Sequence, residues 1–152
     1  MKNILVPIDF TNGSKKALQY SIHFAKQFKS RLILIHVLPR DSAENKEWTQ
    51  RLKAWAEEFV PSEVQVQIHI SRGSEAIEIV NTAKKMMAGL MVISTHGRTG
   101  RAHALAGSLA ENLVQLAPCP VLVVREHERD FIEADAVKNK TEGALNFIGM
   151  AI

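Results

Sequence analysis

The chain has 152 residues, of which 46% are hydrophobic and 23% are charged, a composition typical of a single globular domain. The 19 Lys and Arg residues exceed the 16 Asp and Glu residues by three, but they are scattered in ones and twos, so nothing indicates a nucleic acid as partner. Cys119 is the only cysteine, which excludes an intrachain disulfide and favours a reducing compartment. The apolar runs are far shorter than the ~20 residues that cross a bilayer, and the first residues do not resemble a signal sequence. We therefore expect a cytoplasmic protein with no membrane partner.

The first half of the chain predicts three strands separated by two helices. Residues 3–6 and 32–37 are aliphatic runs without polar alternation, as expected for strands that are buried on both faces of a parallel sheet. Residues 14–28 and 44–59 repeat apolar side chains at helical spacing. In residues 64–70, Val and Ile alternate with Gln and His, a pattern typical of a strand with one wetter face. This strand is therefore expected near an edge of the sheet.

The second half adds two helices and two strands. Residues 74–87 and 108–116 have helical spacing, whereas residues 90–93 and 121–124 are again aliphatic runs. The order of elements is then βαβαβαβαβ. Strands joined by crossover helices form a right-handed, three-layer α/β/α domain. Ligands of such domains usually bind at the carboxyl ends of the strands, near the topological switch point.

The loop that follows the fourth predicted strand has the features of an anion site. Residues 94–101 lead from this strand toward Gly107 and Ser108 at the start of a helix. Glycines such as Gly97 let backbone N–H groups approach an anion closely, and a helix N-terminus favours phosphate. Arg98 adds positive charge nearby.

A purely structural interpretation of this loop is also open. Gly97 and Gly100 would then only shape a turn, and Ser108 with Glu111 would form a capping box that starts the last helix. The glycine spacing matches neither the dinucleotide fingerprint nor the P-loop. Hydride transfer and motor-type ATPase chemistry are therefore not indicated.

Several segments of the chain together resemble the universal stress protein family. The resemblance is carried by residues 4–10 (ILVPIDF), 92–100 (VISTHGRTG), 107–111 (GSLAE) and 117–124 (APCPVLVV). It covers roughly residues 1–125, so we expect a universal stress protein domain there and a C-terminal extension at residues 126–152. It implies an adenine nucleotide alpha hydrolase-like fold, with a five-stranded parallel sheet of order 3-2-1-4-5.

The resemblance also implies a site for ATP or ADP, with magnesium. The family's pattern is G-x-x-G, nine residues, then G-S or G-T, and Ser94 stands here in place of the first glycine. Serine is small, and its hydroxyl can donate a hydrogen bond. The residues implied for the adenine slot are Pro7, Ile8 and Val37; for the ribose or adenine, Asp9; for the phosphates, Gly97, Gly107, Ser108 and Leu109. Ser94 and Arg98 complete the set of residues expected to bind the nucleotide.

Other roles remain open for some of these polar residues. Asp9 precedes a predicted helix, where an Asp frequently acts as a cap. The six histidines lack metal-ligand spacing, so a structural metal is not indicated. No serine elbow, paired-carboxylate motif or Cys/His signature is present, and we expect slow ATP hydrolysis at most.

Two functional hypotheses follow from the resemblance. The first is an ATP- or ADP-binding regulatory module in stress response, and the second is a nucleotide-independent dimeric interaction module on the same fold. Ser94 is the residue that separates them. The strand at residues 121–124 is expected at an open edge, and pairing with its copy in a homodimer would cover it.

The last 27 residues have a different composition from the rest. Residues 126–143 are mostly charged or polar, whereas residues 144–152 are apolar again. We expect a regulatory or assembly appendage, with a frayed terminus as the alternative.

Overall fold

A computed structural model describes residues 1–42, 45–95 and 106–126, with side chains of the last segment described from Leu109 onward. Within these ranges every strand and helix expected from the sequence is present. In chain order the elements are β1 (Asn3–Pro7), α1 (Asn12–Phe28), β2 (Arg31–Leu38), α2 (Lys46–Phe59), β3 (Val66–Arg72), α3 (Glu75–Lys85), β4 (Leu90–Ser94), α4 (Ala106–Leu116) and β5 (Val121–Val124).

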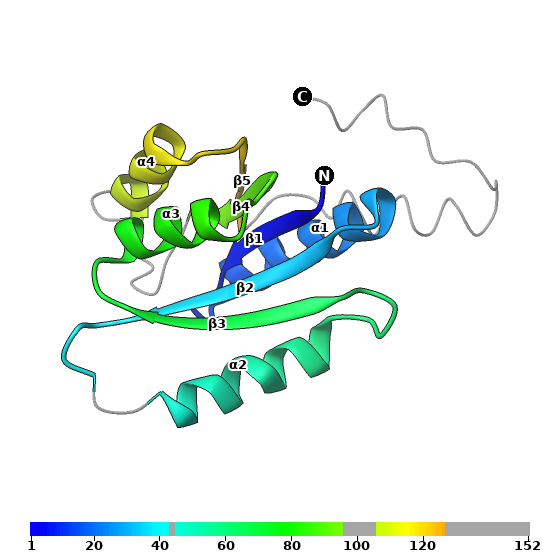
Figure 1. Cartoon of the computed structure of the whole chain (residues 1–152), viewed down its shortest axis with the longest axis horizontal. Helices are drawn as coiled ribbons and strands as arrows, with labels where there is room; N and C mark the ends of the chain where they lie inside the picture. Colours follow the sequence, from blue (N-terminus) through cyan, green and yellow to red (C-terminus); the bar gives the residue numbers. More distant parts are fainter. Residues whose placement is uncertain (43–44, 96–105, 127–152) are drawn as a thin grey trace.

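The five strands form one parallel sheet with the order β3-β2-β1-β4-β5, which confirms the predicted fold (Figure 1). The prediction that the alternating strand lies at an edge is also confirmed, because among the described strands β3 has only β2 as a neighbour. At the other edge lies β5, which pairs with β4. In the part of the chain that is described, none of the helices has the length and apolarity needed to traverse a bilayer.

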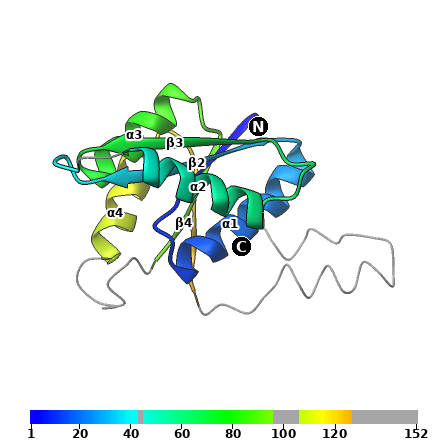
Figure 2. The same ribbon diagram turned by 90° about the horizontal axis from the view of Figure 1, so that it is seen from below.

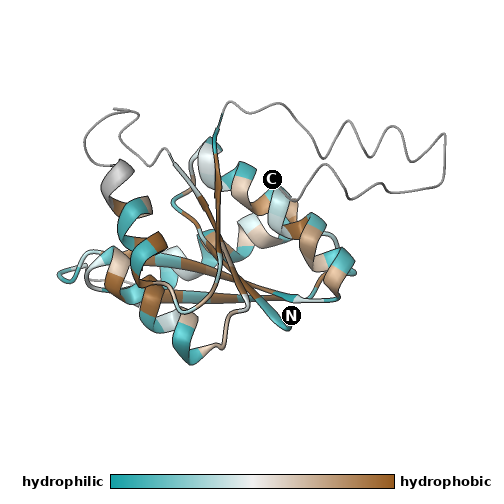
Figure 3. Ribbon diagram, turned by 90° about the horizontal axis from the view of Figure 1, so that it is seen from above, coloured by the Kyte–Doolittle hydropathy of each residue, from teal (hydrophilic) through white to brown (hydrophobic). Residues whose placement is uncertain are grey.

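Two hydrophobic clusters lie on opposite faces of the sheet. One contains side chains of α1 and α2, including Leu18 and Leu52, and the other contains side chains of α3 and α4, including Ile79 and Leu113. Figure 2 shows α2 running along β3, and Figure 3 shows mostly hydrophobic strands between helices of mixed polarity. The central strands are buried on both faces, which is why their sequences show no polar alternation.

Most element boundaries differ from the sequence-based expectation by one or two residues, and three of these differences have a local structural reason or consequence. Val64 lies in a turn before β3, where its N–H donates to the carbonyl of Pro61 at 2.9 Å. Helix α3 ends at Lys85 rather than at Met87, whose φ of 48° is left-handed and cannot continue a right-handed helix. Helix α4 begins at Ala106, so Ser108 lies within its first turn and the proposed capping box at Ser108 is wrong.

The end of α1 is closed by a left-handed residue. Lys29 has φ 50° and ψ 45°, and its N–H donates to the carbonyl of Ala25. The N–H of Ser30 donates to the same carbonyl at 2.9 Å. This position favours glycine, because a side chain in the left-handed conformation is strained.

Candidate functional site

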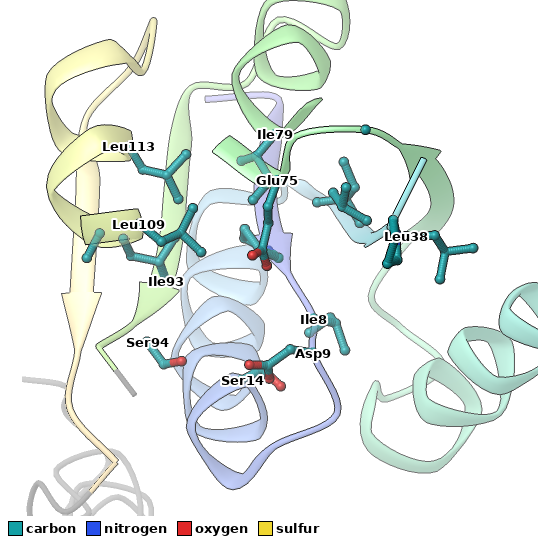
Figure 4. A pocket seen from close by; sticks show the side chains of 16 residues that line it. Ile8, Asp9, Ser14, Leu38, Glu75, Ile79, Ile93, Ser94, Leu109 and Leu113 are labelled. Carbon is teal, nitrogen blue, oxygen red and sulfur yellow. The ribbon is translucent and has the colours of Figure 1, made fainter. Parts of the chain in front are cut away.

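A cavity of about 490 Å³ opens at the carboxyl ends of the strands, where β1 lies between β2 and β4. Helices α1 and α2, which follow β1 and β2, pack on one face of the sheet, whereas α3 and α4, which follow β3 and β4, pack on the other. Sheets of this kind bind ligands where the connections change from one face to the other. Figure 4 shows polar groups from several elements directed into the cavity. Its lining consists of Pro7, Ile8, Asp9, Ser14, Ile35, Val37, Leu38, Pro39, Gly73, Glu75, Ile79, Ile93, Ser94, Leu109, Ala110 and Leu113.

Asp9 occupies the connection between β1 and α1. Its Oδ1 accepts a hydrogen bond from the backbone N–H of Thr11 at 3.1 Å and another from the Thr11 hydroxyl. The helix cap itself is Thr11, whose Oγ1 accepts from the N–H of Ser14 at 3.3 Å. Asp9 therefore supports the cap through one carboxylate oxygen. The other oxygen accepts no hydrogen bond from the residues that are described, so it is available to a ligand in the cavity.

The end of β1 is held in place by a buried histidine on β2. His36 Nδ1 lies 2.7 Å from the carbonyl oxygen of Ile8, and because a carbonyl only accepts, this nitrogen carries the proton. Phe10, with a left-handed φ of 62°, packs on the His36 ring at a centroid distance of 4.8 Å and edge-on to Trp55 at 5.2 Å. These aromatic contacts thus fix the loop that presents Asp9 to the cavity.

The β3–α3 connection forms another wall of the cavity. Gly73 has φ 140°, and a Cβ there would lie 3.1 Å from Glu78 Oε1, so the position requires glycine. Glu78 accepts a hydrogen bond from the Ser71 hydroxyl and is thereby tied to β3. Glu75, the first residue of α3, directs its carboxylate toward Asp9 in Figure 4. It is exposed at the cavity mouth and makes an interaction within the chain.

The remaining wall comes from β4 and α4. Ser94, the last residue of β4, directs its hydroxyl toward the cavity (Figure 4). Leu109 and Leu113 on α4 and Ile93 on β4 cover the apolar side. An apolar slot with a few polar groups at its rim is the usual form of a small-molecule site.

The structure places six of the ten residues implied for nucleotide binding around this one cavity. They are Pro7, Ile8, Asp9, Val37, Ser94 and Leu109. Gly97 and Arg98 lie outside the described residues, and Gly107 and Ser108 belong to the first turn of α4.

Sequence reasoning missed the contributions of α1 and α3, above all Ser14, Glu75 and Ile79. The available signal was Gly73, which follows a predicted strand and therefore lies at the same edge of the sheet as Asp9.

The described residues add neither a metal-binding cluster nor a reactive thiol to these groups. Among the residues with described positions, no cluster of three His, Cys, Asp or Glu side chains could hold a metal ion. Cys119 is half-buried between β5 and α4, and burial raises the pKa of its thiol, which disfavours the reactive thiolate.

The structure is thus an open, doubly wound α/β domain with a cavity at its switch point. The model of the universal stress protein family matches residues 1–125, and the chain belongs to this family. The universal stress protein MJ0531 of Methanocaldococcus jannaschii is 32% identical over 147 residues, which cover 85% of each chain.

Solved structures of the family share the fold. A universal stress protein determined in complex with cAMP has a TM-score of 0.65 at 19% identity, covering 82% of this chain and 97% of that one. The universal stress protein from Archaeoglobus fulgidus in complex with dAMP has a TM-score of 0.63 at 20% identity, covering 81% and 97%. At this level of identity the likeness concerns the fold.

Proposed function

We propose that this universal stress protein is a regulatory module that binds ATP or ADP in the cavity at the carboxyl edge of the sheet. The observation that carries the proposal is the convergence of Asp9, Ser94 and Val37, from three different strand ends, on one cavity of about 490 Å³. Relatives with the same fold have been determined with the adenine nucleotides cAMP and dAMP, which supports the choice of ligand.

Each wall of the cavity suits one part of such a ligand. The apolar side chains around Val37 and Ile35 suit a flat base, and the unengaged oxygen of Asp9 can accept hydrogen bonds from ribose hydroxyls. The first turn of α4, with Gly107 and Ser108, points backbone N–H groups toward the phosphates. Ser94 adds a hydroxyl donor at the position where the family pattern has glycine.

Magnesium fits this arrangement as a companion of the phosphates rather than as a resident ion. The described part of the chain offers no three-ligand metal cluster, and Mg²⁺ commonly binds through phosphate oxygens while keeping several of its waters. The ion would supply charge neutralisation at the phosphates. We propose no dedicated catalysis, and slow hydrolysis of bound ATP at most.

Calorimetry with ATP, ADP, AMP and GTP, together with mass spectrometry of ligand released from the purified protein, tests the proposal. Gly107→Val should abolish ATP binding, because a β-branched side chain in the first turn of α4 would occlude the phosphate site. Glu111→Val, which adds the same side chain at an exposed position of the same helix, should leave binding unchanged. Unchanged affinity in a folded Gly107→Val protein would remove this site, and the nucleotide-independent interaction module would then be favoured.

We further propose a cytoplasmic homodimer in which β5 pairs with its copy, because β5 is an edge strand made only of Val and Leu.

We also propose that residues 126–152 are a separate extension that affects assembly. Its part from residue 127 onward lies outside the described residues. Deletion of residues 126–152 should preserve nucleotide binding and change oligomer size or melting temperature, and a truncated protein identical in both would show the extension to be dispensable.

A further inference from the structure

The helices that begin at the cavity differ in charge. Residues from the starts of α1, α3 and α4 line the cavity. The first turn of α3 carries Glu75 and Glu78, whereas the first turns of α1 and α4 carry no acidic residue. The positive end of the α3 dipole is therefore already offset by carboxylates, and that of α4 is not.

This charge difference would orient a nucleotide bound as proposed above. A triphosphate would be repelled by the carboxylates of α3 and attracted by the N-terminus of α4. The phosphates would accordingly lie against α4 and Ser94, and the base would lie toward α3, where Ile79 and Ile35 provide an apolar surface. Asp9, on the strand between these walls, is left for the ribose.

Glu75 is the carboxylate in position to meet the base. Glu78 is held by Ser71, but the Glu75 carboxylate is directed into the cavity mouth in Figure 4. A carboxylate offers about four acceptor sites, so the interaction that Glu75 makes within the chain leaves capacity for a ligand. A carboxylate accepts hydrogen bonds and donates none, so it distinguishes a base that carries an amino group from one that does not.

We propose that Glu75 determines the base specificity of this site by accepting a hydrogen bond from the exocyclic amino group of adenine. The inference rests on the proposed nucleotide-binding function and adds to it a residue that selects the base. It makes Glu75 a specificity determinant rather than only a stabiliser of the α3 N-terminus.

The test compares the affinities of ATP and purine riboside triphosphate, which lacks only the amino group. The wild-type protein should prefer ATP by roughly fivefold, as expected for one partly exposed hydrogen bond. Glu75→Met, which keeps the length of the side chain but removes the charge and the carboxylate acceptor, should bind the two ligands equally. Glu58→Met removes an exposed charge on α2 and should retain the preference.

The possible results separate the inference from the proposed function. Equal wild-type affinities for the two ligands would overturn the role of Glu75 while leaving nucleotide binding intact, and this measurement requires no variant to fold. Tighter binding of both ligands to Glu75→Met by the same factor would place the phosphates, not the base, beside Glu75 and would also overturn it. Absence of binding by either ligand to the wild type would refute the proposed function and the inference with it.

Discussion

Substitution of Asp9 separates its structural role from its proposed ligand role. In the structure its Oδ1 accepts from the N–H and the hydroxyl of Thr11, and Thr11 in turn caps α1. Asp9→Ala removes both hydrogen bonds, each worth about 1 kcal/mol net. For a chain of this length we expect a loss of about 2 kcal/mol and a melting temperature roughly 4–8 °C lower.

Asp9→Asn keeps an oxygen that can accept from Thr11 but removes the charge. A hydrogen bond to a charged group is roughly twice as strong as a neutral one, so the loss of affinity for ATP should be about tenfold, with a change in melting temperature of only about 1–3 °C. Calorimetric titration measures the affinity for ATP and a thermal scan measures the melting temperature, both on the same protein preparation.

Thr11→Val is the matched control for this prediction. It removes the helix cap, at a cost of about 1 kcal/mol, but leaves the carboxylate of Asp9 in the cavity, so affinity for ATP should change by less than about threefold. If Asp9→Asn binds ATP as tightly as Thr11→Val does, Asp9 only supports the helix cap, and its assignment to the nucleotide is refuted.

Three further predictions concern stability and assembly. Lys29→Gly should relieve the left-handed strain at the end of α1 and raise the melting temperature by about 2–4 °C, whereas Gln27→Gly, inside the helix, should lower it; a decrease in both would refute the strain argument. Burial and, to a lesser extent, the nearby charge of Lys85 lower the pKa of the His69 side chain from its ordinary value of 6.5. The unfolded chain therefore binds a proton at this side chain more readily than the folded chain does, and the free energy of unfolding decreases as the pH falls below 6.5. When the pH is lowered from 7.5 to about 5, the melting temperature of the wild type should fall further than that of His69→Gln. Parallel plots of melting temperature against pH for the two proteins would contradict this. Val123→Lys should yield monomeric or insoluble protein if β5 forms the dimer interface, and an unchanged dimer in light scattering would place the interface elsewhere.

Local pattern was sufficient to predict the layers of this fold. The aliphatic runs of β1 and β4 have no polar alternation because both faces of these strands are covered by helices. The alternation in β3 correctly indicated an edge, because an edge strand keeps one wetter face. The boundaries were less predictable, since Met87 ends α3 through a left-handed backbone conformation that is unusual for methionine.

The site was predictable only in part. The sequence by itself determined that Asp9 and Ser94 follow buried strands, and the resemblance to a family linked them to a nucleotide. Only the tertiary structure brought Glu75 and Ser14 to the same cavity, because the sheet order and the right-handed crossovers decide which helix starts lie beside the carboxyl ends of β1 and β4. The same is true of the contacts that hold the end of β1, where His36 reaches the carbonyl of Ile8 across 28 positions of the sequence. Such contacts depend on which strands pair and in which register, and no local pattern of residues encodes that pairing.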